Sequence, residues 1–135
     1  ISDSSSAIAQ QVSIGTGCTG LGTVTHEIGH ALGFYHEQAR PERDNFVTVH
    51  TENIADNGQG QFTKKSYSSA INYGVQYDYG SVMHYGSYYF TANGRQTITT
   101  KDANYQATIG QRDAGPSFAD VKQINAAYCS GEKNS

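Results

Sequence analysis

Apolar residues recur along residues 21–32 at the spacing of an α-helix. At about 100° per residue, Leu21, Val24 and Ile28 fall within one arc, and two histidines lie on the opposite side. Gly33 follows this segment, and a residue that readily adopts positive φ commonly ends a helix. The pattern therefore predicts one amphipathic helix that ends at a sharp bend.

The rest of the chain predicts a second helix and several short extended pieces. Residues 117–129 carry apolar positions at helical spacing, and Ser117 with Asp120 resembles a capping box. A shorter helix is expected around residues 52–56, ended by the two glycines that follow it. Residues 67–94 are rich in Tyr, Gly, Ser and Asn, which predicts irregular backbone with turns. Alternating or β-branched residues predict extended segments at residues 10–14, 46–49 and 96–101.

The composition is typical of a loop-rich globular domain and not of a long helical bundle. Apolar residues make up 36% of the 135 residues, with 15 glycines and 10 tyrosines, and the length fits a single domain. The formal net charge is −3 and no Lys/Arg cluster exists, so neither nucleic acid nor an anionic membrane is indicated as a partner. No apolar run approaches the ~20 residues that a membrane-spanning helix needs.

Three of the 5 histidines lie close together in the sequence HEIGHALGFYH. Side chains four apart on a helix project side by side, so His26 and His30 can converge on one ion, at about 2.0–2.1 Å from each nitrogen. The bend at Gly33 allows His36 to reach the same ion. For HExxH alone, a solvated helix face is the alternative interpretation. The full spacing H-E-x-x-H-x-x-G-x-x-H favours a zinc site of the metzincin type when a Met-turn follows.

The single methionine, Met83, lies in the pentapeptide SVMHY downstream of the histidines. Alone it would be interpreted as a core residue that fills a gap, but in this order along the chain it fits the Met-turn. Three neutral imidazoles leave one position on zinc open, where the pKa of a bound water falls toward ~7. Glu27, next to the first histidine, is the candidate general base for that water. The alternative for Glu27 is a solvated residue on the helix surface.

These residues resemble the astacins, a branch of the metzincin zinc endopeptidases. The likeness continues through the segments RPERDNFVTV, YDYGSVMHYGSYYF, IGQR and DVKQINAAYC, and it covers nearly the whole chain from residue 10 to residue 129. The resemblance implies that residues 1–135 form an α+β, zincin-like catalytic domain. It also implies that this domain contains a zinc helix, a Met-turn and a C-terminal helix.

The resemblance further implies roles for individual residues. His26, His30 and His36 are expected to bind Zn²⁺, and Glu27 is expected to act as the catalytic base. Tyr85 is expected to be an additional zinc ligand that swings away when substrate arrives and hydrogen-bonds the oxyanion. Without the family likeness, this tyrosine would be interpreted as a packed ring with a solvated hydroxyl.

Residues just after the third histidine are expected to be structural. Glu37 resembles the family glutamate that contacts the buried amino terminus of the mature enzyme. Arg40, Arg43 and Asp44 are expected to brace the turn after the zinc site. Glu42 stands where the family commonly has aspartate, which is a mild change.

The resemblance is incomplete at the front of the chain. An astacin catalytic domain begins well upstream of residues 10–14, so we expect most of the twisted sheet and the upper wall of the cleft to lie outside this sequence. The apolar arc of the first predicted helix would then have little to pack on. Cys18 and Cys129 are either free thiols, one bridge, or, as the resemblance implies, half-cystines that pair with upstream residues.

The leading hypothesis for function is a secreted zinc metalloendopeptidase that hydrolyses peptide bonds of protein substrates by metal-activated water, and a monomer is expected. No secretory signal is visible in residues 1–10, so the chain is either cytosolic or a processed product. A catalytically impaired, zinc-containing extracellular binding module is the alternative. The absent cleft wall favours it, and the presence of both Glu27 and Tyr85 argues against it. A third hypothesis, a cytosolic thiol protein, is supported only by the two cysteines.

Overall fold

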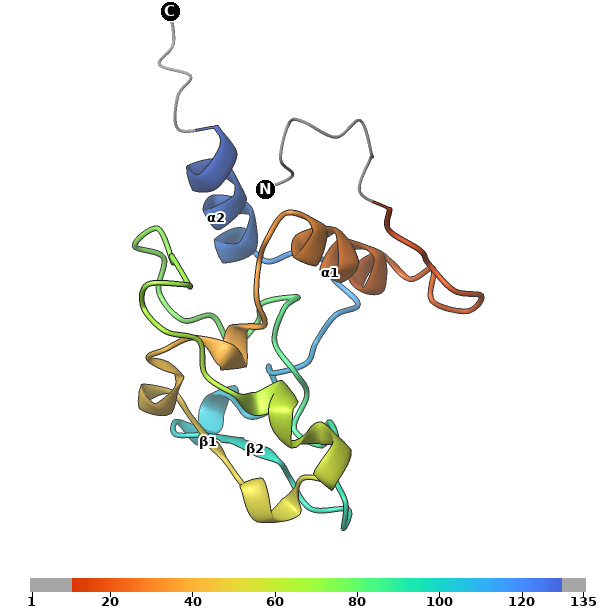
Figure 1. The fold of residues 1–135 in the computed structure, drawn as a ribbon, viewed down its shortest axis with the longest axis vertical. Coiled ribbons are helices and arrows are strands. Elements are labelled where there is room, and N and C mark those ends of the chain that lie inside the picture. The colour runs from red at the N-terminus through yellow and green to blue at the C-terminus, as the bar shows by residue number, and fades with distance from the viewer. Residues whose placement is uncertain (1–10, 130–135) are drawn as a thin grey trace, which may run out of the picture.

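The structure is a computed structural model, and it describes residues 11–129 of the chain. Within this range, two α-helices, α1 (Leu21–Ala31) and α2 (Phe118–Tyr128), lie on one side of a small sheet formed by β1 (Val47–Val49) and β2 (Ile98–Thr100) (Figure 1). Short 3-10 helices connect them: η1 (Glu37–Ala39), η2 (Arg43–Asn45), η3 (Thr51–Asn53), η4 (Asp56–Phe62) and η5 (Ala103–Tyr105). The mixed helix and sheet content confirms the α+β class.

The sheet consists of two antiparallel strands made entirely of β-branched residues. Val47 pairs with Thr100, Thr48 with Thr99, and Val49 with Ile98, and such side chains pack well on a pleated surface. The strands agree with the extended segments predicted at residues 46–49 and 96–101, although each is shorter. A two-stranded sheet is marginally stable by itself, so its stability depends on the side chains that pack on it.

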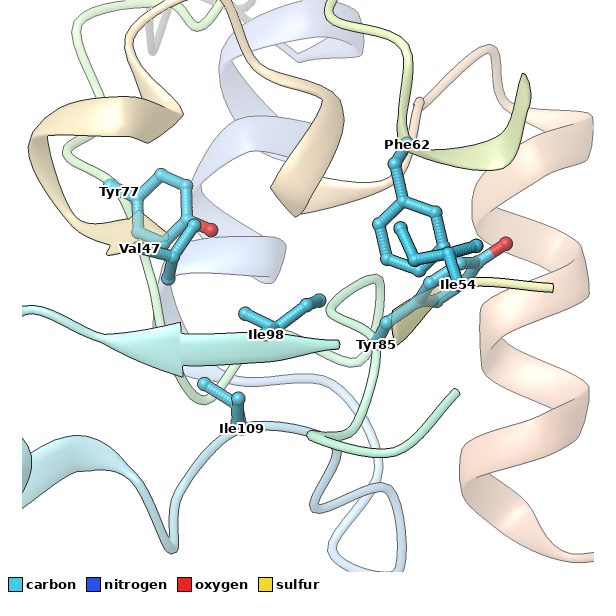
Figure 2. Packing of buried hydrophobic residues seen from close by; sticks show 7 residues of the cluster. All are labelled: Val47, Ile54, Phe62, Tyr77, Tyr85, Ile98 and Ile109. Atoms are coloured by element: carbon cyan, nitrogen blue, oxygen red, sulfur yellow. The ribbon is translucent and has the colours of Figure 1, made fainter. Parts of the chain in front are cut away.

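One apolar cluster surrounds this sheet. Val47 and Ile98 are almost completely buried at its centre, and burying a side chain of this size stabilises the fold by about 1.5–3 kcal/mol. Figure 2 shows the seven buried residues of the cluster: Val47, Ile54, Phe62, Tyr77, Tyr85, Ile98 and Ile109. Tyr85, one of the residues expected to take part in chemistry, is therefore also a core residue.

The apolar faces of the two α-helices are exposed in the described residues. Leu21 and Ile28 of α1 are 60% and 44% exposed, and Phe118 at the start of α2 is 84% exposed. The buried residues of α1 are instead Gly22, His26 and Gly29, so the helix packs through its histidine side. The expectation that the apolar arc of α1 has little to pack on agrees with these exposures.

Two predictions of local structure were wrong. No strand forms over residues 11–14, because no described segment pairs with them; residue 10 lies outside the described residues. The helix expected around residues 52–56 is split into η3 and η4, because Ile54 pairs with Thr91 in an antiparallel bridge and adopts extended backbone. η4 also continues through the two glycines that were expected to end it.

The two cysteines, Cys18 and Cys129, are exposed and are not bonded to each other, so the single-bridge alternative is wrong. None of the helices in residues 11–129 has the length and apolar character needed to cross a membrane.

Candidate metal centre

The end of α1 carries the first two histidines and redirects the chain toward the third. Gly33 has φ of +89°. Its amide donates to the His30 carbonyl at 2.9 Å, and the Phe34 amide donates to the Gly29 carbonyl at 3.0 Å. This is the hydrogen-bond pattern of a Schellman motif, and it confirms the predicted bend. The bend returns the chain so that His36 faces the side of α1 that carries the other histidines.

The three imidazoles point their Nε2 atoms at one another. His30 Nε2 lies 3.1 Å from His36 Nε2, which lies 3.3 Å from His26 Nε2. The Nδ1 atoms of His26 and His30 lie 2.8 and 2.9 Å from the backbone oxygens of Val82 and Phe34. A carbonyl oxygen only accepts, so both Nδ1 atoms carry a proton and donate to these carbonyls, which leaves the Nε2 atoms facing inward.

Inward-facing ring nitrogens at this separation suit a cation bound between them. Four tetrahedral ligands at the usual Zn–N distance have nitrogens about 3.3–3.4 Å apart, close to the distances of His36 Nε2 from the other two Nε2 atoms. Burial lowers the pKa of His26, and burial together with the neighbouring imidazoles lowers the pKa of His36 to about 3. His26 and His36 are therefore neutral at physiological pH. Together with His30 they form a group that could hold a metal ion.

Residues 81–85 form a tight turn directly beneath α1. The His84 amide donates to the Ser81 carbonyl at 3.0 Å. The Met83 side chain lies so close to α1 that a Cβ added at Gly29 would be 2.7 Å from its sulfur. The Val82 carbonyl orients His26, as a second hydrogen bond commonly does for a ligand histidine. The turn therefore supports the histidine group from below.

An acidic residue on α2 fixes this turn. Asp120 accepts the Ser81 hydroxyl at 2.6 Å and the Val82 amide at 2.9 Å, and the capping box predicted with Ser117 is also present. The capping role was visible in the sequence. The contact with the turn was missed, because Asp120 lies almost 40 residues from it and no local signal reports such a contact.

The Tyr85 ring packs against the histidine group. Its centroid lies 4.4 Å from that of His36, and its hydroxyl points toward α1 in Figure 2. Burial raises the pKa of Tyr85, although the Arg112 guanidinium acts in the opposite direction. The phenol is therefore a neutral hydrogen-bond donor at physiological pH. Arg112 was missed as a charged neighbour of the site, because only its place in the IGQR segment distinguished it.

Glu27 lies on α1, beside the first histidine, and is partly buried. Its carboxylate is close enough to act on His26, whose pKa it raises against the larger effect of burial. No hydrogen bond from another described residue occupies this carboxylate. Glu27 thus places a carboxyl group next to the histidine group that makes no hydrogen bond with the other residues of 11–129.

The residues after His36 form a buried ionic cluster. Glu37 is paired with Arg40 at 2.9 Å and accepts the Asp78 amide at 2.8 Å. Burial raises the pKa of Glu37 to about 7, against the effect of Arg40. Glu37 and Arg40 also line a cavity of about 300 Å³ between the end of α1 and α2. The contact of Glu37 with an amino terminus stays a prediction.

Arginine side chains hold the neighbouring backbone. Arg40 donates to the carbonyl of Val75 at 2.8 Å, and Arg43 donates to the carbonyls of Gln38 and Phe62. Because buried carbonyls need a donor, these contacts agree with the expected bracing role.

Comparison with known proteins agrees with this geometry. The family model for astacin, a family of peptidases, matches residues 4–129. The chain is 65% identical over 124 residues to zinc metalloproteinase nas-34 of Caenorhabditis elegans, covering 92% of this chain and 20% of that protein. It is 49% identical over 119 residues to protein SpAN of Strongylocentrotus purpuratus, covering 88% of this chain and 19% of that protein.

Among solved structures, high choriolytic enzyme 1, a hatching enzyme zinc-protease from Oryzias latipes, aligns with a TM-score of 0.78 and 42% identity. The alignment covers 87% of this chain and 57% of that one. The chain thus spans about a fifth of the length of these curated relatives and more than half of the solved structure.

Proposed function

Since the chain belongs to the astacin family of zinc peptidases, we propose that it forms part of the catalytic domain of a secreted endopeptidase that hydrolyses peptide bonds in proteins. Zinc is the cofactor of this family and of the named relatives. The observation that carries the proposal is the convergence of three Nε2 atoms, with His36 Nε2 lying 3.1 and 3.3 Å from those of His30 and His26. The likeness to a hatching enzyme supports protein as the substrate class and a site of action outside the cell.

We assign the metal to His26, His30 and His36. When bound there, zinc supplies a Lewis acid and lowers the pKa of a water, so that hydroxide is available near neutral pH. Glu27 would accept the proton of that water and later give it to the departing amine, as a general base and then a general acid. Its position next to His26, with no competing hydrogen bond from the described residues, suits this role.

Tyr85 has two roles in this proposal. Its hydroxyl would approach the metal before substrate binds, and it would then donate a hydrogen bond to the oxyanion of the tetrahedral intermediate. The raised pKa of Tyr85 keeps the phenol protonated, and only a protonated phenol can donate. The packing of its ring on His36 keeps the hydroxyl on the histidine side of the core.

The test uses the purified full-length protein and Glu27→Gln, with Glu52→Gln as the control. Glu52 is a solvent-exposed carboxylate in η3, with its side chain 69% exposed. Glu27→Gln should retain one zinc per chain and lose on the order of 10²–10⁴-fold in cleavage of a protein substrate. Glu52→Gln should retain both zinc and cleavage.

Two outcomes would contradict the proposal. A wild-type protein that contains zinc and cleaves no protein substrate would favour a binding module instead. A wild-type protein without stoichiometric zinc would remove the metal site altogether.

A further inference from the structure

Four aromatic rings enclose Tyr85. Ring centroids lie at 4.4 Å for His36, 5.1 Å for Tyr89, 5.7 Å for Phe62 and 5.8 Å for Phe90. Phe62 is only 3% exposed, whereas Tyr89 and Phe90 are 38% and 40% exposed. The inner wall of this enclosure is therefore fixed in the core, and its outer wall is made by two side chains that face solvent.

The backbone of Tyr85 is held at both ends. Its amide donates to Oε1 of Gln38 at 3.0 Å, and its carbonyl accepts from Nδ1 of His84 at 2.7 Å. His84 is fixed in turn by the Tyr77 hydroxyl, which donates to Nε2 at 2.7 Å. Any movement of Tyr85 is therefore confined to its side-chain torsions, and the surrounding rings decide where the phenol lies.

Phe90 occupies its place in this enclosure with a strained backbone. Its φ is +59°, a conformation that bulky residues rarely adopt and that persists only where the surroundings enforce it. The Ala55 amide donates to the Phe90 carbonyl at 2.8 Å, and the next residue, Thr91, pairs with Ile54. Strain of this kind is concentrated at sites where it serves function.

η4 is shaped to receive the Phe90 side chain. A Cβ added at Gly58 would lie 2.6 Å from Cβ of Phe90 and 2.8 Å from its ring, so only glycine leaves the necessary room. Four residues later, Phe62 of the same helix contacts both Phe90 and Tyr85. Gly58 thus brings the strained residue against the inner wall.

We propose that Phe90 is a positioning residue for Tyr85. Its strained backbone and its close contact with Gly58 hold its ring in the outer wall of the enclosure, and this ring keeps the phenol beside the histidine group. This inference rests on the proposed function of Tyr85 and adds a residue to which the sequence assigned no role. Phe90 itself does not contact the reacting atoms in this proposal. It limits the side-chain orientations that Tyr85 can adopt.

The test removes the ring without adding strain. Phe90→Gly deletes the wall, and glycine accepts positive φ without a penalty. Tyr73→Gly is the matched control, because Tyr73 is also an aromatic residue with positive φ, 52°, and is 44% exposed. Phe90→Tyr retains the ring and should restore the wild-type behaviour. Thermal unfolding of each variant verifies that it folds.

Two readouts separate positioning from general damage. In the full-length protein, the nuclear Overhauser contact between the Tyr85 and His36 rings should weaken in Phe90→Gly and stay unchanged in Tyr73→Gly and Phe90→Tyr. In the zinc-loaded protein, Phe90→Gly should lower kcat about ten-fold, less than the ~10²–10³-fold expected for loss of an oxyanion donor in Tyr85→Phe. In the Tyr85→Phe background, Phe90→Gly should have no further effect on kcat.

The outcomes decide between the two proposals. An unchanged contact between the rings in Phe90→Gly overturns the role of Phe90, as does an equal loss of kcat in both backgrounds. If Tyr85→Phe retains full activity, the proposed function of Tyr85 is wrong. The ring contact, which does not depend on turnover, still decides whether Phe90 positions the phenol.

Discussion

Asp120→Ala should weaken the fold and the metal site together, because one carboxylate joins α2 to the turn at residues 81–85. It accepts the Ser81 hydroxyl at 2.6 Å and the backbone amides of Val82 and Ser117 at 2.9 and 2.8 Å. Loss of a helix cap costs about 1 kcal/mol, and each of the two contacts with the turn contributes about 1.5 kcal/mol. We therefore expect the free energy of unfolding to fall by about 4 kcal/mol, a large part of the total for a small domain.

The effect on the metal site follows from the Val82 peptide. Asp120 holds its amide, and its carbonyl lies 2.8 Å from Nδ1 of His26. Removing a group that orients a ligand histidine commonly reduces metal affinity by about 10–100-fold. We expect the zinc dissociation constant of Asp120→Ala to rise by about ten-fold or more.

Urea unfolding at pH 7 measures the stability change, and competition with a chromophoric chelator measures zinc affinity. Ser117→Ala is the control, because it removes the hydroxyl of the cap and leaves the contacts between Asp120 and the turn in place. It should cost about 1 kcal/mol without changing zinc affinity. Asp120→Asn, which retains one acceptor oxygen, serves if Asp120→Ala does not fold. Equal zinc affinities for Asp120→Ala, Asp120→Asn and wild type would refute the coupling.

Three further predictions concern α1 and its surroundings. Gly29→Ala should lower the thermal unfolding midpoint, because its Cβ would lie 2.7 Å from the Met83 sulfur. The cost of overpacking, about 1–3 kcal/mol, exceeds the gain of about 1 kcal/mol from alanine in a helix. A raised midpoint would contradict this. Glu42→Gln should cost about 2 kcal/mol at pH 7 in urea unfolding, because Oε1 of Glu42 accepts from Arg40 and Asn72. Burial raises the pKa of Glu42, but a hydrogen bond from its own backbone amide, together with Arg40 and Asn72, lowers it overall. The stabilisation is therefore present above pH 4.5 and is lost as the pH falls through the folded pKa. A difference between variant and wild type that persists at low pH would be the contrary result. Removal of zinc with a chelator should speed hydrogen exchange of the α1 amides while β1 and β2 stay protected, and uniform acceleration in all three elements would argue against a local role of the metal.

The elements that the sequence predicted correctly are those set by local signals. The periodicity of α1, the positive φ at Gly33 and the capping box at Ser117 each depend on residues within one or two turns of helix. The spacing of the three histidines is also local, since the helix and the bend after it place all three rings. These features needed no knowledge of distant contacts.

The errors and omissions involve partners far along the chain. Residues 11–14 alternate as a strand would, but a strand exists only where another one pairs with it. The break between η3 and η4 comes from the pairing of Ile54 with Thr91. The wall at Phe90 requires Gly58, more than 30 residues earlier, to lie directly against it. The sequence pattern within a short segment does not indicate any of these distant contacts.

The packing of α1 explains why a bound metal should contribute to stability as well as to catalysis. Its apolar arc is exposed in the described residues, and its buried side carries Gly29 and His26 instead of large apolar side chains. Within residues 11–129 it therefore gains little of the apolar burial that fixes β1 and β2 in the core. An ion bound to all three rings would join α1 to the segment after the bend. A metal centre in this position would therefore also anchor the helix that supplies two of its ligands, and the stability of α1 would depend on the ion that it helps to bind.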